Sequence, residues 1–409
     1  MAKRTVTYRP ELVDQNIELS VRHLKQFFKF GHGKNAFVTK AVHDISFDIK
    51  KGECFGVVGE SGCGKTTTGR TLIKLYKATS GSVYFKGHRI VAGSRWNKKE
   101  IKWKRIKTKR KIKELKEEMN ERIRALGEEQ GNADFVAAET AKIRENYAKT
   151  INKMESDLEA LIKEQKEKIA QHNFDEAHVD KKLMSKMQMI FQDPVDSLDP
   201  RMTVSDIIQE GLHIQGQYNR FENSQKVKDV LVKVGLLPEY ASRYPHEFSG
   251  GQRQRIGIAR ALIMNPDFLI CDEPISALDV SIRAQIINLL NNLKDEMGLT
   301  IMFIAHDLSV VKYFCDRIAV MYFGNIVEMA SSDELFAHPL HPYTKALLSA
   351  IPKPDPLSEK VRKRFIYTPA NEHDYSKEGP TLQEITPGHF VMANTEEMEK
   401  YRKMLNEKK

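Results

Sequence analysis

The chain has 409 residues, of which 41% are hydrophobic and 29% are charged, and its formal net charge is +10. No uninterrupted apolar stretch approaches the roughly 18 residues of a membrane-spanning helix, and residues 1–14 lack the apolar core of a secretion signal. We therefore expect a soluble cytosolic protein of two or three modules, and the positive charge permits either a nucleic acid or an anionic membrane as a partner.

Four cysteines lie far apart in the chain and form no C-x-x-C pair. They occur mainly in apolar, strand-like surroundings. This usage favours buried free thiols over a disulfide framework.

The first part of the chain predicts strands around a glycine-rich loop. Apolar and polar residues alternate at 17–28, a second patterned run covers 41–49, and the turn-rich segment 31–35 separates these two predicted strands. A further apolar run, 54–58, predicts a buried strand that leads directly into the glycines. Turn residues bracket a short strand pattern at 80–87, which predicts a β-hairpin.

The loop after the buried strand has the sequence of a phosphate-binding loop. Its pattern is G-x-x-x-x-G-K-[ST], in which backbone N–H groups and the start of the next helix face anionic oxygens. Lys65 is placed to reach the terminal phosphates, and Thr66 to hold a magnesium ion. The residues that we expect to bind nucleotide here are Gly59, Ser61, Gly62, Cys63, Gly64, Lys65, Thr66 and Thr67. The sequence therefore predicts a nucleoside-triphosphate site.

Residues 94–186 have a different composition, rich in Lys, Glu, Arg, Ala and Ile, with almost no glycine and no proline. Apolar residues recur every three or four positions in two stripes, at 112–126 and 143–161, and a turn signal at 131–134 separates them. This pattern predicts an inserted antiparallel helical hairpin, a coiled coil, with arms of roughly 45 to 55 Å at about 1.5 Å per residue. The alternative is a disordered charged linker. It is disfavoured because a disordered segment does not need apolar residues at regular intervals, whereas this segment has them.

Globular sequence resumes at 187 with an apolar run closed by a turn signal, and 203–261 reads mostly as helix. Three further apolar runs, 268–271, 300–305 and 318–321, alternate with helical patterns. Strands that alternate with helices predict a parallel sheet covered by helices on its faces. Beyond residue 352 the sequence is polar and contains prolines at intervals, which indicates a small appendage or a loosely ordered tail.

Two carboxylates close the apolar run that begins at residue 268. Phosphoryl transfer needs one carboxylate to support Mg²⁺ and a second group to position or deprotonate the attacking water. Asp272 fits the first role and Glu273 the second. Acidic pairs at strand ends are often only solvated turns, so this interpretation depends on the phosphate loop upstream.

A polar Gly-Gly turn opens the helix that begins near residue 250, and such an end presents free N–H groups and a serine hydroxyl to an anion. The run 248–262 resembles the signature sequence of ABC-type ATPases, with Phe248 where that family usually has leucine. Further landmarks of the family follow from the resemblance. Gln192 matches the Q-loop, 276–279 the D-loop, and His306 the switch histidine.

Further segments resemble, more specifically, the ATP-binding subunits of oligopeptide and dipeptide importers. This resemblance covers about residues 18–87 and 187–356. The segments that carry it are 191–194, 198–204, 272–281, 304–311 and 341–352, of which the last is the most specific to this family. The inserted hairpin departs from the family pattern. The tail also departs from it, because no cysteine follows Cys315 and an iron–sulfur cluster there is excluded.

The resemblance implies an α/β fold of the P-loop NTPase (ABC ATPase) type, with an antiparallel β subdomain, an α-helical signature subdomain and the inserted antiparallel helical hairpin. The domains that we expect are an N-terminal extension, 1–16, a nucleotide-binding domain over 17–93 and 187–350, the hairpin, 94–186, and a C-terminal appendage, 351–409.

The resemblance also implies that ATP is hydrolysed with Mg²⁺ between two nucleotide-binding domains arranged head to tail. Glu273 would be the general base, His306 would stabilise the γ-phosphate, and Gln192 would link the metal to the membrane subunits. The residues implied as metal ligands are Thr66, Gln192 and Asp272. The signature residues that would contact the partner's ATP are Ser249, Gly250, Gly251 and Gln252. Asp279 would couple the two sites. Phe28, or its neighbour Phe27, is the candidate for stacking on adenine.

The function implied is the ATP-hydrolysing subunit of a peptide importer, peripheral on the cytoplasmic face of the membrane. The partners implied are a second ATPase subunit (the same or a related chain), two integral membrane permease subunits and, through them, an extracytoplasmic peptide-binding protein. A chromosome-structuring or DNA-repair ABC ATPase is the alternative, but its coiled coil is usually much longer and it is not expected to contain 341–352. A regulatory protein that only binds ATP is disfavoured by Glu273, and no specific nucleic acid partner is expected.

The start of the predicted hairpin is strongly basic. Residues 98–111 contain nine lysines and arginines and a single acidic residue, Glu100. Such crowding destabilises a bare helix, so we expect contact with an anionic lipid surface. A solvated basic face without a specific partner explains the run equally well.

Overall fold

The computed structural model describes residues 4–31, 36–128, 133–351 and 365–406. The chain divides into two compact units. One contains Ala92–His178 and the stretch up to Thr7, and the other contains Tyr8–Val91 and Val179–Lys409. None of the helices in the described ranges is long and apolar enough to cross a membrane. Most of the predicted turn at 31–35, and the first half of the turn at 131–134, lie outside these ranges.

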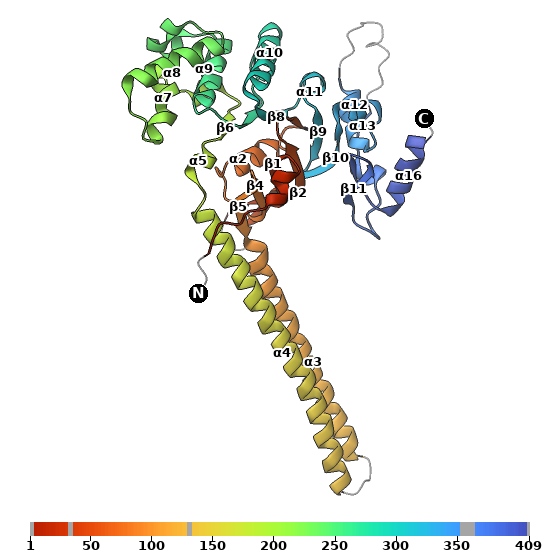
Figure 1. Ribbon diagram of the computed structural model, residues 1–409. Helices are drawn as coiled ribbons and strands as arrows, with labels where there is room; N and C mark the ends of the chain where they lie inside the picture. Colours follow the sequence, from red (N-terminus) through yellow and green to blue (C-terminus); the bar gives the residue numbers. More distant parts are fainter. Residues whose placement is uncertain (1–3, 32–35, 129–132, 352–364, 407–409) are drawn as a thin grey trace. The chain divides into compact units, whose positions relative to one another are not determined.

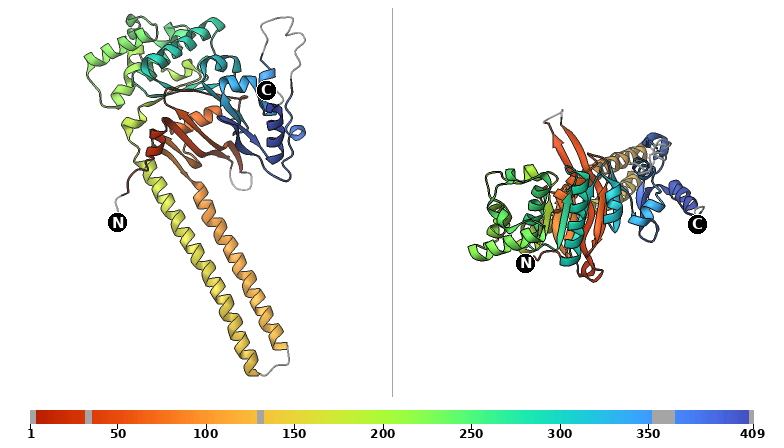
Figure 2. Two further views of the ribbon diagram at one scale, coloured as in Figure 1. Left: turned by 45° about the vertical axis from the view of Figure 1, so that its right-hand side comes forward. Right: turned by 90° about the horizontal axis from the view of Figure 1, so that it is seen from above.

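The unit that contains Ala92–His178 is a helical hairpin, as the sequence predicted (Figure 1). Helix α3 spans Arg95–Glu128 and α4 spans Ala133–Ala177, and the two lie side by side (Figure 2). The residues of both predicted apolar stripes are half-buried, while most of the residues between them are exposed. This alternation is expected when each helix covers the apolar stripe of the other.

The second arm of the hairpin is longer than predicted. Helix α4 has 45 residues, which correspond to about 68 Å. Near the start of α3, Asn97 Nδ2 donates a hydrogen bond of 2.7 Å to Gln165 Oε1, about three turns before α4 ends. The last turns of α4 instead contact the N-terminal stretch, where the buried Asp175 accepts hydrogen bonds from the backbone N–H and hydroxyl of Thr7 at 3.0 and 2.7 Å.

Two sheets build the second unit. A four-stranded sheet has the order β2-β1-β4-β5, and β1 is antiparallel to both β2 and β4. An eight-stranded sheet within the described residues has the order β11-β12-β10-β9-β3-β8-β7-β6, and its run from β9 to β6 is parallel. The strands are β1 Ile17–Phe30, β2 Phe37–Lys50, β3 Cys54–Val58, β4 Ser80–Phe85, β5 His88–Ser94, β6 Met187–Ile190, β7 Phe268–Asp272, β8 Thr300–Ala305, β9 Arg317–Tyr322, β10 Asn325–Ser331, β11 Thr381–Thr386 and β12 His389–Ala393.

Helices surround these sheets, and Figure 1 shows α7, α8 and α9 grouped together. The helices of this unit are α1 Pro10–Asp14, α2 Lys65–Leu72, α5 Lys181–Met184, α6 Pro194–Ser197, α7 Val204–Ile214, α8 Arg220–Lys233, η2 Pro238–Ser242, η3 Pro245–Glu247, α9 Gly250–Leu262, α10 Val280–Met297, α11 Leu308–Phe314, α12 Ser332–Ala337, α13 Pro342–Ser349, α15 Pro369–Glu372 and α16 Thr395–Asn406. The mixed architecture confirms the fold class predicted from the sequence.

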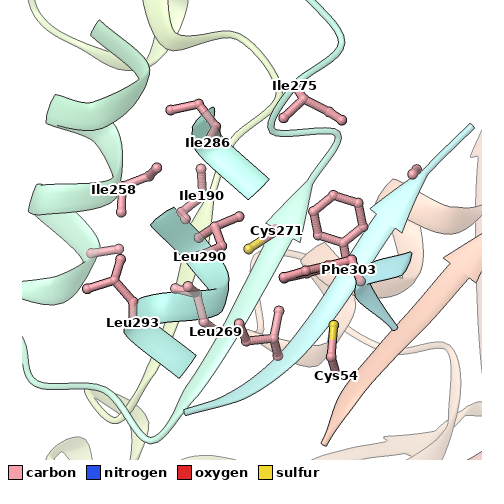
Figure 3. Packing of buried hydrophobic residues seen from close by; sticks show 14 of the residues in the cluster. Cys54, Ile190, Ile258, Leu269, Cys271, Ile275, Ile286, Leu290, Leu293 and Phe303 are labelled. Atoms are coloured by element: carbon pink, nitrogen blue, oxygen red, sulfur yellow. The ribbon is translucent and has the colours of Figure 1, made fainter. Parts of the chain in front are cut away.

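The parallel strands are buried on both faces. Along β7, Leu269 and Cys271 belong to one core cluster and Phe268 and Ile270 to another, because successive side chains of a strand point to opposite faces. Figure 3 shows the first of these clusters, where Leu269 and Cys271 lie close to residues of α10 and of the neighbouring strand β8. Because both faces of these strands are buried, their sequences are continuous apolar runs and do not alternate between apolar and polar residues.

The C-terminal region contains more structure than the sequence indicated. Strand β12 pairs antiparallel with β10, as in Glu328↔Val391, and β11 pairs with β12, as in Gln383↔Val391. Residues 381–393 therefore extend the main sheet instead of forming a loosely ordered tail. Met398 and Tyr401 of α16 are buried in a small cluster with Val391 and Ala393.

Candidate nucleotide site

The phosphate loop joins β3 to α2, as predicted. Gly64 precedes α2 with φ +106°, and a Cβ atom there would lie 2.1 Å from the carbonyl oxygen of Ala41, so only glycine fits. Lys65 is 4% exposed, and its Nζ donates to the backbone oxygens of Gly59 at 2.8 Å and Glu60 at 3.0 Å. The sequence thus folds locally so that the loop surrounds the lysine ammonium.

The other residues predicted in this loop differ in exposure. Ser61 and Gly62 are exposed, Thr66 and Thr67 are half-buried, and Cys63 is buried. Burial raises the pKa of the Cys63 thiol. A raised pKa disfavours the reactive thiolate, so the position of this cysteine inside the loop does not make it a ready nucleophile.

A threonine and a buried carboxylate lie where a metal ion is predicted. Thr66 Oγ1 donates a hydrogen bond of 2.7 Å to Asp272 Oδ1. Asp272 is fully buried at the end of β7, and this burial raises the pKa of its carboxyl group. Its Oδ2 is buried and has no hydrogen-bond partner among the described residues. Two hard oxygen donors, one of them unsatisfied, fit a magnesium ion.

The structure brings together the three residues that the resemblance implicates in catalysis. Glu273 Oε2 accepts a hydrogen bond of 3.3 Å from Gln192 Nε2 and lies 3.2 Å from His306 Nδ1. These side chains follow β7, β6 and β8, three strands that are neighbours in the sheet, so their carboxyl ends meet at one edge. Gln192 and His306 therefore hold one carboxylate oxygen between them.

The backbone of Glu273 is strained. Its φ is +45°, a value that residues other than glycine rarely adopt, and its N–H donates to the oxygen of Ile304 at 3.0 Å. The carbonyl oxygen of Glu273 accepts from the Ser276 hydroxyl at 3.0 Å, which fixes the turn. Strain of this kind persists only where neighbouring contacts hold it, and it clusters at functional sites.

The predicted signature residues begin helix α9. Ser249 caps the helix: its hydroxyl accepts from Gln252 N at 3.4 Å, and its own N–H donates to Gln252 Oε1 at 3.0 Å. Ser249 and Gly250 are exposed. A Cβ atom on Gly251 would lie 2.6 Å from Ile282 Cγ2 of α10, so the helix start packs closely against the helix that follows Asp279. Asp279 itself is exposed and precedes α10.

The two candidates for adenine stacking face different neighbours. Phe28 meets Tyr76 edge to face at 5.2 Å between ring centroids, whereas Phe27 stacks on His43 at 6.2 Å. Both phenylalanines are half-buried. These contacts give each ring a fixed orientation.

Tyr343 is a residue at the phosphate loop that sequence reasoning missed. Its hydroxyl accepts a hydrogen bond of 3.0 Å from the backbone N–H of Glu60, and its side chain is 2% exposed. The sequence identifies 341–352 as the segment most specific to one family, but it assigns no role to Tyr343. That family specificity was the signal that could have directed attention to it.

Comparison with known proteins identifies the family. The family described as "ABC transporter" matches residues 42–168 and 148–276, and "Oligopeptide/dipeptide transporter, C-terminal region" matches 327–379. The second match contains Tyr343 and overlaps the segment that the sequence analysis singled out.

Individual relatives agree over most of the chain. It is 46% identical over 386 residues to the oligopeptide transport ATP-binding protein OppF of Bacillus subtilis (strain 168), covering 94% of this chain and 98% of that protein. It is 44% identical over 380 residues to OppF of Streptococcus pyogenes serotype M1, with coverage of 92% and 95%. To AmiF of Streptococcus pneumoniae serotype 4 it is 43% identical over 378 residues, with coverage of 92% and 96%. The resemblance drawn from the motifs is confirmed, and the chain belongs to the ABC transporter family, among the ATP-binding proteins of oligopeptide transport.

Proposed function

We propose that this chain hydrolyses ATP to energise the import of peptides through a membrane transporter, and that it works as one half of a head-to-tail dimer of nucleotide-binding domains. The observation that carries the proposal is the meeting of Gln192, Glu273 and His306 at the edge of the sheet, beside Asp272 and Thr66. This is the set of groups that phosphoryl transfer to water requires.

Each group has a distinct task in the proposed reaction. Lys65 and the backbone N–H groups of the loop bind the β- and γ-phosphates of ATP. The Glu273 carboxylate takes the proton from the attacking water, and His306 stabilises the γ-phosphate while its contact with Oε2 holds Glu273 in place. The strained backbone of Glu273 aims its carboxylate before substrate arrives, which reduces the reorganisation needed during the reaction.

Magnesium is proposed as the cofactor that accompanies ATP. Thr66, Asp272 and Gln192 would hold it, and the ion would neutralise charge on the phosphate oxygens. The unsatisfied Oδ2 of the buried Asp272 supports this assignment. Adenine would stack on Phe28, with Phe27 as the competing ring.

The dimer follows from the position of the signature. Ser249 and Gly250 are exposed at the start of α9, where free N–H groups favour an anion. We infer that Ser249–Gln252 complete the ATP site of a second subunit, the same or a related chain, and that Asp279 couples the two sites. The remaining partners would be two permease subunits and an extracytoplasmic peptide-binding protein that contacts the permease. These partners would place the chain at the cytoplasmic face of the membrane.

Two substitutions test the dimer. Lys65→Ala removes the ammonium that binds phosphate, so the isolated chain should lose ATP affinity. Ser249→Arg should leave that affinity unchanged but block hydrolysis, because its side chain would occupy the partner's γ-phosphate position. Equal loss of ATP binding in both variants would contradict the head-to-tail arrangement. Co-purification with permease subunits supports transport, whereas ATPase activity stimulated by DNA would favour the chromosome-structuring alternative.

An anionic lipid surface is the partner proposed for 98–111. The lysines and arginines of this stretch are all exposed, and both tryptophans of the chain lie on the same helix, Trp96 58% and Trp103 65% exposed. Tryptophan beside lysine and arginine is typical of helices that contact the membrane interface.

Vesicle binding tests this contact. Neutralising Lys102, Lys104, Arg105 and Lys109 together should weaken salt-sensitive binding to vesicles that contain anionic lipid, because the attraction is electrostatic. The matched control neutralises Lys142, Lys149, Lys153 and Lys168 of α4. Binding that is unchanged in the first variant, or equally weakened in both, would rule out the assigned surface.

A further inference from the structure

One peptide group at the start of the phosphate loop connects two side chains that are far apart in the sequence. The peptide between Gly59 and Glu60 offers its carbonyl oxygen to Lys65 Nζ at 2.8 Å and its N–H to the Tyr343 hydroxyl at 3.0 Å. A peptide unit is planar and rigid, so a bond that fixes its N–H also fixes the direction of its carbonyl. Tyr343 therefore orients one of the two oxygens that hold the lysine ammonium.

Tyr343 is itself held by a network of buried polar groups. His341 caps α13, and its Nδ1 accepts from Tyr343 N at 3.1 Å. The fully buried Glu328 accepts from the N–H groups of Leu340 at 2.8 Å and His341 at 3.0 Å, and it lies 2.9 Å from His389 Nε2 of β12. Strand β10, strand β12 and the start of α13 are thus tied together around the tyrosine.

Aromatic rings close around Tyr343 as well. Its ring centroid lies 4.4 Å from that of Tyr322 and 5.6 Å from that of Tyr367. Such packing leaves the tyrosine little rotational freedom, and burial raises the pKa of its hydroxyl, which keeps the hydroxyl neutral at physiological pH. A neutral, fixed hydroxyl is a suitable acceptor for a backbone N–H.

We propose that Tyr343 is a positioning residue for phosphate binding, which acts through the Gly59–Glu60 peptide on Lys65. The proposal rests on the assignment of ATP binding to the phosphate loop. It gives the C-terminal segment of the chain a role in the nucleotide site: the network from β12 to α13 holds the tyrosine, and the tyrosine holds the loop in the geometry that presents the lysine.

The test is Tyr343→Phe, which keeps the ring and removes the acceptor. Tyr367→Phe is the matched control, because it removes a hydroxyl from the same aromatic cluster. We expect the dissociation constant and KM for ATP to rise about fivefold to tenfold in Tyr343→Phe, the factor for one lost hydrogen bond. The value of kcat should stay within about twofold of wild type, since the groups around Glu273 are unchanged.

A second measurement reports on the loop directly. Hydrogen exchange at the Glu60 amide should be faster in Tyr343→Phe than in the wild type and in Tyr367→Phe, whether or not nucleotide is present. The proposal would be overturned if Tyr343→Phe had the same ATP affinity and the same Glu60 exchange rate as the wild type. Equal effects of Tyr343→Phe and Tyr367→Phe would also overturn it, because they would indicate a role in packing alone. A wild-type chain that fails to bind ATP would instead refute the assignment of the nucleotide site.

Discussion

The two glycines of the signature make a matched pair for a stability test. Both occupy the first turn of α9, so replacement by alanine gains about the same helix propensity, roughly 1 kcal/mol, at each position. A Cβ atom on Gly250 would lie 3.8 Å from Leu278 Cδ2, an ordinary contact. A Cβ atom on Gly251 would lie 2.6 Å from Ile282 Cγ2, about 1 Å closer than carbon atoms pack.

The cost at Gly251 follows from the stiffness of its neighbour. Ile282 is β-branched and cannot easily rotate its Cγ2 away, so the helix start must shift or the side chain must leave its rotamer. Overpacking of this kind costs about 1 to 3 kcal/mol. We therefore expect Gly251→Ala to be less stable than Gly250→Ala by about this amount, with Gly250→Ala equal to or slightly more stable than wild type.

Urea unfolding followed by circular dichroism measures the difference. Ile282→Ala removes the obstructing methyl group, so Gly251→Ala should cost less in that background than in the wild type, and the two substitutions should not add. Because Ile282 belongs to the helix that follows Asp279, ATPase activity should fall in Gly251→Ala together with stability. Equal unfolding midpoints for the Gly250 and Gly251 variants, or full additivity with Ile282→Ala, would refute this reasoning.

Other substitutions test the remaining parts of the structure. Glu273→Gln should reduce phosphate release by a factor of about 10² to 10⁴ while ATP binding is retained, because it removes the base and not the phosphate loop; a normal rate would exclude Glu273 as the base. Burial lowers the pKa of His341 to about 3, so the neutral imidazole stabilises the fold above the unfolded pKa of about 6.5, and this contribution is lost as the pH falls from there towards 3. His341→Asn, which can still cap α13, should reduce the loss of unfolding free energy between pH 7 and pH 4.5, and an unchanged loss would show that His341 does not cause it. Replacing 95–178, which leaves α5 intact, with a short Gly/Ser loop should preserve ATP binding, measured by nucleotide fluorescence, and the excised segment should be strongly helical by circular dichroism; loss of ATP binding would make the hairpin part of the core.

Strands buried on both faces could be predicted closely from the sequence. The run 54–58 matches β3 at both ends, because a continuous apolar run followed by a glycine turn has few other interpretations. Strands β11 and β12 were not predicted. No residue of β11 is buried, and β12 has only five residues. The two become strands because β12 pairs with β10 and β11 pairs with β12, in a register that no local pattern reveals. Tertiary context overrides weak local preference in such strands.

Some parts of the candidate site could also be predicted from local sequence patterns, and others could not. The phosphate loop and the pair Asp272 and Glu273 were found from local patterns, since the chemistry requires particular residues at fixed spacing. The grouping of Gln192 and His306 around Glu273 came from the family resemblance, and the geometry agrees with it. The Tyr343 contact joins residues that are 283 positions apart, so it could be seen only after folding.

The long hairpin between β5 and β6 has a consequence for how the chain folds. A flexible linker of roughly 90 residues would cost about 2 kcal/mol more to close than a link of about ten, because closure entropy grows with the logarithm of length. Helices α3 and α4 lower this cost. Helix α4 begins only a few residues after α3 ends, so the two can pair turn by turn from that point, and helices form within microseconds. We therefore expect the insertion to be a closed element, with its two ends brought closer together, before β6 pairs with β7. The rate of folding should then depend on the topology of the sheet, and the chain can accommodate an insertion of this length without a matching delay.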